Sequence, residues 1–136
     1  MYPEDLIAPM RHELAAAGFI ETKTAEDVTA NINQKGTTFV VVNSVCGCAA
    51  GSARPGARTA VAGSVKPDRM ITVFAGNDVE AVNKARELMM PFPPSSPAMA
   101  LFKDGELVHM LERHHIEGRN ADAIAANLQS AFEEFC

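Results

Sequence analysis

The sequence contains no tryptophan, one tyrosine and only three cysteines among its 136 residues. Leucine, isoleucine, valine, methionine and the seven phenylalanines must therefore fill the core. No apolar run approaches the roughly 20 residues that a membrane-spanning helix needs, and residues 1–5 are acidic and lack a signal-peptide pattern. We therefore expect no membrane partner and a cytoplasmic location.

Positive charge is also scarce, since 12 Lys and Arg residues face 17 Asp and Glu residues and the formal net charge is −5. Phosphate binding needs a basic surface, so we expect no nucleic-acid partner. The composition, 47% hydrophobic and 21% charged, is that of a globular chain rather than a disordered one. The length predicts a single domain over residues 1–136.

Apolar periodicity predicts alternating helices and strands. The predicted helices cover residues 4–17, 24–34, 48–62, 77–90 and 120–136, and the predicted strands cover residues 19–23, 38–43, 70–75, 98–102 and 107–111. Alternating units indicate an α/β fold in which helices cover both faces of a largely parallel sheet. The last two strands are separated by a four-residue turn, so a hairpin should add antiparallel strands.

Local signals refine three of the predicted helices. Pro9 predicts a kink or a restart in the first helix, and Pro55 predicts a kink in the third. Asn77 is a candidate N-cap, with the Glu80 side chain reaching back toward it. Downstream of the cysteine pair, Arg54 and Arg58 could add positive potential to the thiols, but we expect both to be solvated surface residues.

Cys46-Gly47-Cys48 directly follows the apolar strand 38–43 and opens the next helix. A helix N-terminus stabilises a thiolate through its unpaired N–H groups and partial positive charge. Cys46, where the strand ends, is expected to be the more exposed thiol and the attacking nucleophile, with Cys48 as the resolving thiol. Gly47 should let the backbone turn sharply and leave space for an incoming disulfide.

Two other interpretations of these cysteines remain open. They could be ordinary buried residues, or they could be ligands in a metal or iron–sulfur module. Cys46, Cys48, His114 and His115 would be a plausible zinc set. However, one intervening residue is not the usual spacing, and adjacent histidines point in different directions. We therefore expect no metal, and two loop histidines that solvate or cap the last helix.

Cys136 is the third thiol and the last residue of the chain. It follows Phe132 by four positions, which places it on the apolar side of the last predicted helix. It is either a frayed terminal residue, the interpretation that we favour, or an additional thiol that exchanges with the cysteine pair.

Two features of the chain resemble known proteins. The cysteine pair between a buried strand and a helix, together with residues 97–105, resembles the thioredoxin fold, in which a cis-proline opens a strand. Cys46-Gly47-Cys48, Ser-Ser-Pro at 95–97 and Arg-His-His-Ile-Glu-Gly at 113–118 closely resemble the bacilliredoxin family of bacterial thiol-disulfide proteins. The resemblance covers essentially the whole chain.

This resemblance implies a thioredoxin-like three-layer α/β/α sandwich, with a central mixed sheet and an extra N-terminal helix. It implies a redox enzyme that removes the low-molecular-weight thiol bacillithiol, a co-substrate rather than a bound cofactor, from mixed disulfides on client proteins. The alternative is a protein disulfide isomerase or general disulfide reductase. The resemblance also implies that Pro97 is cis and that the backbone of Ser96 lies beside Cys46, where it can pair with a bound thiol.

Overall fold

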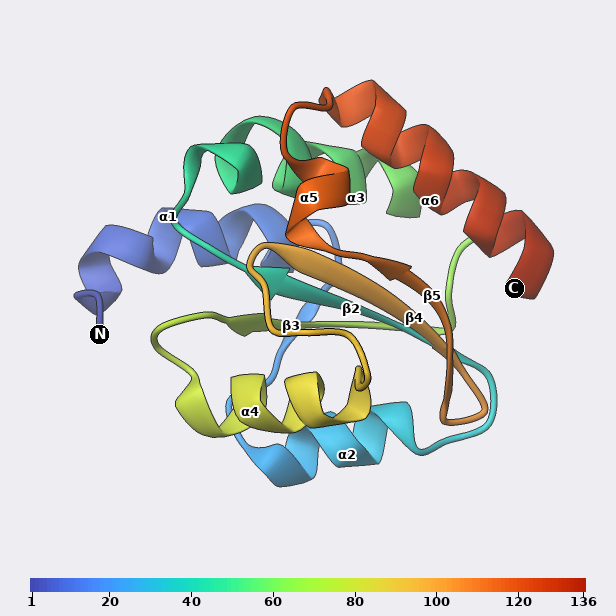
Figure 1. The fold of residues 1–136 in the computed structure, drawn as a ribbon, viewed down its shortest axis with the longest axis horizontal. Helices are drawn as coiled ribbons and strands as arrows, with labels where there is room; N and C mark the ends of the chain where they lie inside the picture. The colour runs from blue at the N-terminus through green and yellow to red at the C-terminus, as the bar shows by residue number, and fades with distance from the viewer.

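The computed structural model describes residues 1–136 as a mixed five-stranded sheet between two layers of helices (Figure 1). The strands are β1 (Ile20–Glu21), β2 (Thr37–Asn43), β3 (Arg69–Phe74), β4 (Ala98–Lys103) and β5 (Glu106–Leu111). The helices are α1 (Glu4–Ala15), α2 (Ala25–Ile32), the π-helix η1 (Ala49–Ala53), α3 (Arg54–Val61), α4 (Val79–Leu88), α5 (Arg113–Ile116) and α6 (Ala121–Phe135). None of these helices has the length and apolar character needed to cross a membrane.

The strands are ordered β1-β3-β2-β4-β5, with β1, β3 and β2 parallel and β4 and β5 antiparallel to their neighbours. At the end of β2, Val42 lies opposite Val73 of β3 and Ala98 of β4. The residues that follow β2 and those that precede β4 therefore meet at the same end of the sheet. This register brings the cysteine pair and Pro97 to one edge of the molecule.

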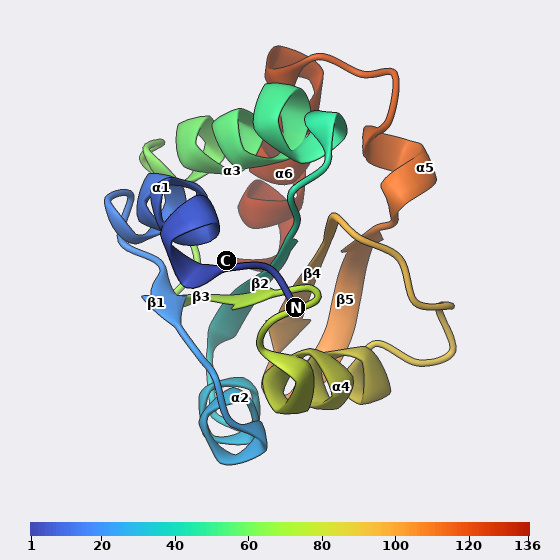
Figure 2. The same ribbon diagram turned by 90° about the vertical axis from the view of Figure 1, so that its left-hand side faces the viewer.

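The central strand β2 is buried along its whole length and divides the core in two. Phe39 and Val41 pack with the layer of α1, α3 and α6, whereas Val40 and Val42 pack with α2 and α4. Figure 2 shows these two helical layers on opposite sides of the sheet. Side chains alternate across a strand, so one continuous apolar run supplies both cores.

The predicted sandwich, mixed sheet, late hairpin and N-terminal helix are all confirmed. One helix was not predicted: α5 contains His114 and His115, which we had expected in a loop. Four residues are too few for a periodic apolar pattern. The helix is instead set by a local capping box in which Glu112 and His115 exchange hydrogen bonds.

The structure narrows one proline expectation and corrects the other. Pro9 lies inside a helix that continues through it from Glu4 to Ala15, which excludes a restart, while a kink there stays a prediction. Pro55 occupies the first turn of α3, where a missing N–H costs little because that group has no intrahelical partner. The irregular hydrogen bonding comes just before it, in the π-helix η1.

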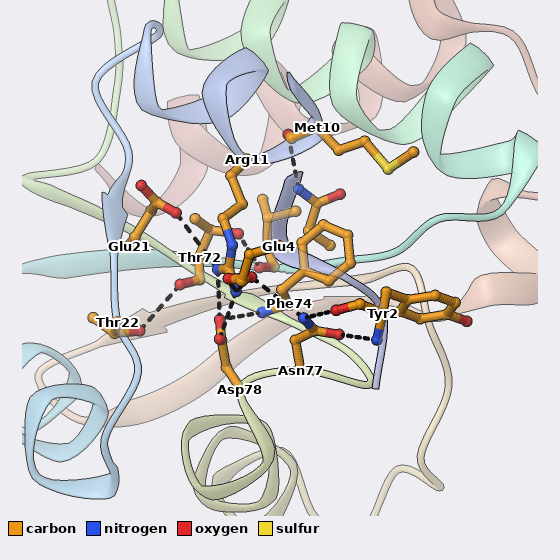
Figure 3. Close-up of polar contacts among 12 residues, drawn as sticks. Tyr2, Glu4, Met10, Arg11, Glu21, Thr22, Thr72, Phe74, Asn77 and Asp78 are labelled. Carbon is orange, nitrogen blue, oxygen red and sulfur yellow. Dashed lines mark hydrogen bonds and ion pairs between the residues drawn. The ribbon is translucent and has the colours of Figure 1, made fainter. Parts of the chain in front are cut away.

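The predicted cap of α4 is wrong. Asp78 flanks the helix without a side-chain cap, and the Asn77 side chain pairs with both backbone groups of Tyr2, at 2.9 and 2.8 Å (Figure 3). Glu80 accepts a hydrogen bond from the backbone N–H of Ala25, at 2.9 Å. Both side chains therefore bond to distant segments of the chain, because tertiary packing brings those segments close.

A bidentate ion pair also ties α1 to the end of β3. Both Arg11 Nη atoms donate to the carboxylate of the buried Asp78, each at 2.8 Å, and Asp78 accepts the Phe74 N–H at 3.0 Å (Figure 3). The Asp78 hydrogen bond is the largest of the effects that raise the pKa of Arg11. Paired bonds of this kind fix orientation as well as position, so α1 is held in place on the sheet.

Candidate active site

The cysteine pair lies where β2 ends and η1 begins. Both thiols are free and half-buried. The backbone carbonyl of Cys46 accepts hydrogen bonds from the N–H groups of Ala49 and Ala50, at 3.0 and 3.2 Å, and so starts the helical turn. Single π-turns within helices occur often at functional sites, and here the π-helix directly follows Cys48.

Exposure does not separate the two thiols, so the expectation that Cys46 is the more exposed one is not confirmed. Their pKa values do separate them. Burial has the largest influence on the pKa of Cys46 and acts upward. Hydrogen bonds from the Cys48 thiol, the Ala49 N–H and the Ser44 hydroxyl outweigh it, and the pKa of Cys46 is lowered.

The pKa of the neighbouring thiol, Cys48, shifts in the opposite direction. Burial, then the hydrogen bond to Cys46 and the negative charge on Cys46, raise the pKa of Cys48, while the positive charge of Arg113 acts against them. The thiolate is the attacking species in disulfide exchange. The lowered pKa favours the thiolate at Cys46, and the raised pKa favours the protonated thiol at Cys48.

Ser44 orients the backbone that leads into the pair. Its hydroxyl accepts a hydrogen bond from the Cys46 N–H at 3.3 Å, and its own N–H donates to the Asn43 side chain at 2.8 Å. Ser44 is buried, so few solvent molecules compete for these bonds. The sequence gives no sign of this role, because a serine between a strand and a helix is common in loops.

Arg54 lies beneath the same loop and is almost fully buried, with 3% of its side chain exposed, so the expectation that it is a surface residue is wrong. Its Nη1 donates to the Asn43 side chain at 3.0 Å and to the Ser44 carbonyl at 2.7 Å, and its Nε donates to Glu13 of α1. A buried charge must be paired, and α1 supplies the partner. Arg58, one helical turn onward, is exposed as expected.

Gly47 contributes space rather than an unusual backbone. Its φ lies outside the left-handed region, so the backbone conformation here is not one that favours glycine. Gly47 is exposed, and a Cβ built on it would meet no atom within 4 Å. The space beside Gly47, between the two cysteines in the chain, is therefore open, as expected.

The Ser96–Pro97 peptide bond is cis, as the resemblance predicted. Arg113 contacts this segment twice: its Nη1 donates to the Ser96 carbonyl at 3.0 Å, and its backbone N–H donates to the Ser95 hydroxyl at 3.2 Å. The charges of Cys48 and Cys46 both act on Arg113 and raise its pKa, after the larger effect of the Glu117 hydrogen bond. Sequence reasoning missed Arg113, although it begins the 113–118 motif.

The proposed set of two cysteines and two histidines is not assembled. The metal-ligating side chains that do gather are Glu112, His114 and His115, whose ligand atoms lie within 4.8 Å of one another. His115 Nδ1 already accepts the Glu112 N–H at 3.0 Å. Neither cysteine belongs to this group.

Cys136 is exposed at the end of α6. Figure 1 shows this terminus at the opposite end of the molecule from the turn between β2 and η1. The structure therefore does not bring Cys136 to the cysteine pair. Exchange between them within one molecule would need a large rearrangement.

The fold is shared with thioredoxins of known structure. It matches the thioredoxin of Malassezia sympodialis with a TM-score of 0.61 and 13% identity, over 87% of this chain and 90% of that one. It matches mitochondrial thioredoxin 3 of Saccharomyces cerevisiae with a TM-score of 0.60 and 14% identity, over 86% and 95%. The chain therefore has the thioredoxin fold, with its cysteine pair directly after the central strand β2.

Sequence comparison then gives the family. Residues 2–136 match the model of the family described as disulphide isomerase. The chain is 60% identical to a bacilliredoxin of Cytophaga hutchinsonii, over 98% of this chain and 99% of that protein. It is 56% identical to a bacilliredoxin of Bacillus licheniformis, over 99% and 95%. The chain therefore belongs to the bacilliredoxin family. Family and fold together make it a thiol-disulfide oxidoreductase.

Proposed function

We propose that this oxidoreductase removes bacillithiol from mixed disulfides on cytoplasmic client proteins, with Cys46 and Cys48 as its catalytic residues. The names of its bacilliredoxin relatives support the choice of bacillithiol. The observation that carries the proposal is that the pKa values of the two thiols shift in opposite directions. The pKa of Cys46 is lowered and that of Cys48 is raised, so one thiol attacks while the other waits.

The first step is an exchange between sulfur atoms. The Cys46 thiolate attacks the bacillithiol sulfur of the mixed disulfide, and the client sulfur leaves as a thiolate that takes a proton from water. Bacillithiol is then joined to Cys46. We expect the backbone of Ser96, beside the cis bond to Pro97, to pair with the bound thiol, and the space at Gly47 to admit it.

Two routes can release bacillithiol. Cys48, after losing its proton to solvent, attacks the Cys46 sulfur and expels bacillithiol as a thiolate, leaving a Cys46–Cys48 disulfide. Alternatively, a second bacillithiol thiolate attacks the bacillithiol sulfur, giving bacillithiol disulfide and a Cys46 thiolate. Electrons balance in both routes, because each exchange breaks one S–S bond and forms another.

A trapping experiment tests this function. Cys48→Ser removes the resolving thiol, so incubation with a bacillithiolated client should leave one bacillithiol on Cys46 and release the reduced client. Mass spectrometry of the intact protein and its peptides detects the adduct. Cys46→Ser is the matched control and should leave the client modified. If the Cys48→Ser protein accumulates no adduct on Cys46, the mechanism fails.

The family description favours a second function, isomerisation of misformed protein disulfides. Comparing turnover on a bacillithiolated client with turnover on a scrambled-disulfide client separates the two. Faster turnover of the scrambled client would make the isomerase the main activity. Metal content after purification under reducing conditions tests the remaining metal-site alternative, in which Cys46 and Cys48 would be ligands.

A further inference from the structure

The guanidinium of Arg113 is fixed at the edge of the active site by two partners. Its Nη1 donates to the Ser96 carbonyl at 3.0 Å, and its Nε donates to Glu117 at 3.0 Å. The remaining terminal nitrogen, Nη2, makes no hydrogen bond, and 43% of the side chain is exposed. An arginine held on one side and open on the other is suited to bind a carboxylate.

The free side of the Arg113 guanidinium lies near the segments that carry the reaction. Ser96 precedes Pro97 at the start of β4, and β4 pairs with the end of β2, from which Cys46 follows. Arg113 interacts electrostatically with both thiols. A small thiol joined to Cys46 and paired with the Ser96 backbone would therefore have its outer groups beside Arg113.

The surrounding charge makes this cation distinctive. The chain carries a net charge of −5, and the nearby acidic groups are Glu112 and Glu117, of which Glu117 already pairs with Nε. No other cation appears among the leading influences on either active-site thiol. An anionic substrate that approaches the cysteine pair therefore meets one fixed positive group.

We propose that Arg113 binds a carboxylate of the low-molecular-weight thiol and so directs Cys46 to attack the sulfur of that thiol rather than the sulfur of the client. This inference rests on the proposed function. The choice of sulfur decides the product: attack on the small thiol frees the client, whereas attack on the client sulfur leaves the client joined to Cys46 and releases the small thiol. In both cases one S–S bond is exchanged for another. Arg113 would thus determine substrate class and direction of attack.

Two small disulfides of similar size test this role without bacillithiol. Dithiodipropionate carries carboxylates and hydroxyethyl disulfide is neutral. Rates of adduct formation on Cys46 are measured with both, in the Cys48→Ser background, which isolates the first step. Variants Arg113→Gln and Arg113→Lys are compared with Arg58→Gln, which removes the same charge from an exposed site on α3.

We expect Arg113→Gln to lower the ratio of the anionic to the neutral rate about 2- to 5-fold, the range of exposed charge pairs. Arg113→Lys should restore part of the ratio, Arg58→Gln should leave it unchanged, and high salt should reduce it in the parent protein. A role in cysteine reactivity alone would slow both disulfides equally and leave the ratio unchanged.

The outcomes separate this inference from the function beneath it. If both disulfides react and the ratio is the same with Arg113→Gln, the role of Arg113 is overturned and the proposed function stands. If neither disulfide reacts at Cys46, the proposed function is overturned and the role of Arg113 falls with it. A ratio that falls equally with Arg58→Gln would indicate a general charge effect and would also overturn the role.

Discussion

Two arginines approach the cysteine pair from different sides, and they differ in burial. Arg54 lies beneath the loop with 3% of its side chain exposed, whereas Arg113 lies at its edge with 43% exposed. Both donate to a backbone carbonyl of an active-site segment, Arg54 to Ser44 and Arg113 to Ser96. Each arginine donates from Nε and Nη1 and leaves Nη2 without a hydrogen bond, but only Arg113 is exposed enough for a ligand to reach that nitrogen.

The difference in burial predicts that one arginine matters for the stability of the fold and the other for the reactivity of the thiols. Removal of a buried cation leaves its partners unpaired away from water, which is costly. Removal of an exposed one returns its partners to solvent at little cost. We therefore expect substitutions of Arg54 to act mainly on folding and substitutions of Arg113 to act mainly on thiol chemistry.

The largest expected effect is on folding. Arg54→Met keeps the apolar stem but removes the donor to the Ser44 carbonyl and to the Glu13 carboxylate, and it should lower the free energy of unfolding by about 2–4 kcal/mol. Urea unfolding followed by circular dichroism measures the change. Arg58→Met, on the exposed side of α3, should change it by less than about 0.5 kcal/mol. Equal effects of the two substitutions would remove the contrast between buried and exposed arginines.

The next effect is on the pKa of Cys46. A lowered pKa means that the thiolate is present above that pKa and is lost as pH falls through it. Cys48→Ala removes the strongest donor to Cys46, so the pKa of Cys46 should rise and its alkylation by iodoacetamide should shift to higher pH. Cys48→Ser keeps an O–H donor and should shift the profile less. Identical profiles for the two variants would show that this hydrogen bond does not lower the pKa.

A smaller effect is expected at the second thiol. Arg113 acts to lower the pKa of Cys48, so Arg113→Gln should raise it and move Cys48 alkylation to higher pH. The Cys46→Ser background isolates Cys48 from its neighbour, and the denaturation midpoint should stay close to that of the parent. A shift to lower pH, or the same shift with Arg58→Gln, would contradict a local effect of Arg113.

The predictable part of this site is the part that is local in sequence. The buried strand ending at Asn43 and the adjacent Cys46-Gly47-Cys48 are contiguous, so apolar pattern and residue type placed the cysteine pair at the end of a central strand. The alternation of helices and strands gave the sheet and its two covering layers in the same way. Neither inference needed a contact between distant residues.

The missed residues depend on contacts across long separations. Arg54 pairs with Glu13, 41 positions away, and Arg113 pairs with Ser96, 17 positions away. No periodicity connects such pairs, because each forms only when the fold has brought two distant segments together. The same reason explains the wrong cap at Asn77, whose side chain pairs with Tyr2, 75 positions away.

The smallest effect concerns the serine that Arg54 helps to hold. Its hydroxyl ranks below Cys48 and the Ala49 N–H among the donors that lower the pKa of Cys46. Ser44→Ala should therefore raise this pKa less than Cys48→Ala does, as the pH profile of alkylation will show. Ser52→Ala is the matched control, because the Ser52 hydroxyl donates to the Arg119 carbonyl and not to the thiols. If Ser44→Ala shifted the profile as far as Cys48→Ala, Ser44 would be a main source of thiolate stabilisation, and the buried arginine would act on reactivity through the serine it holds.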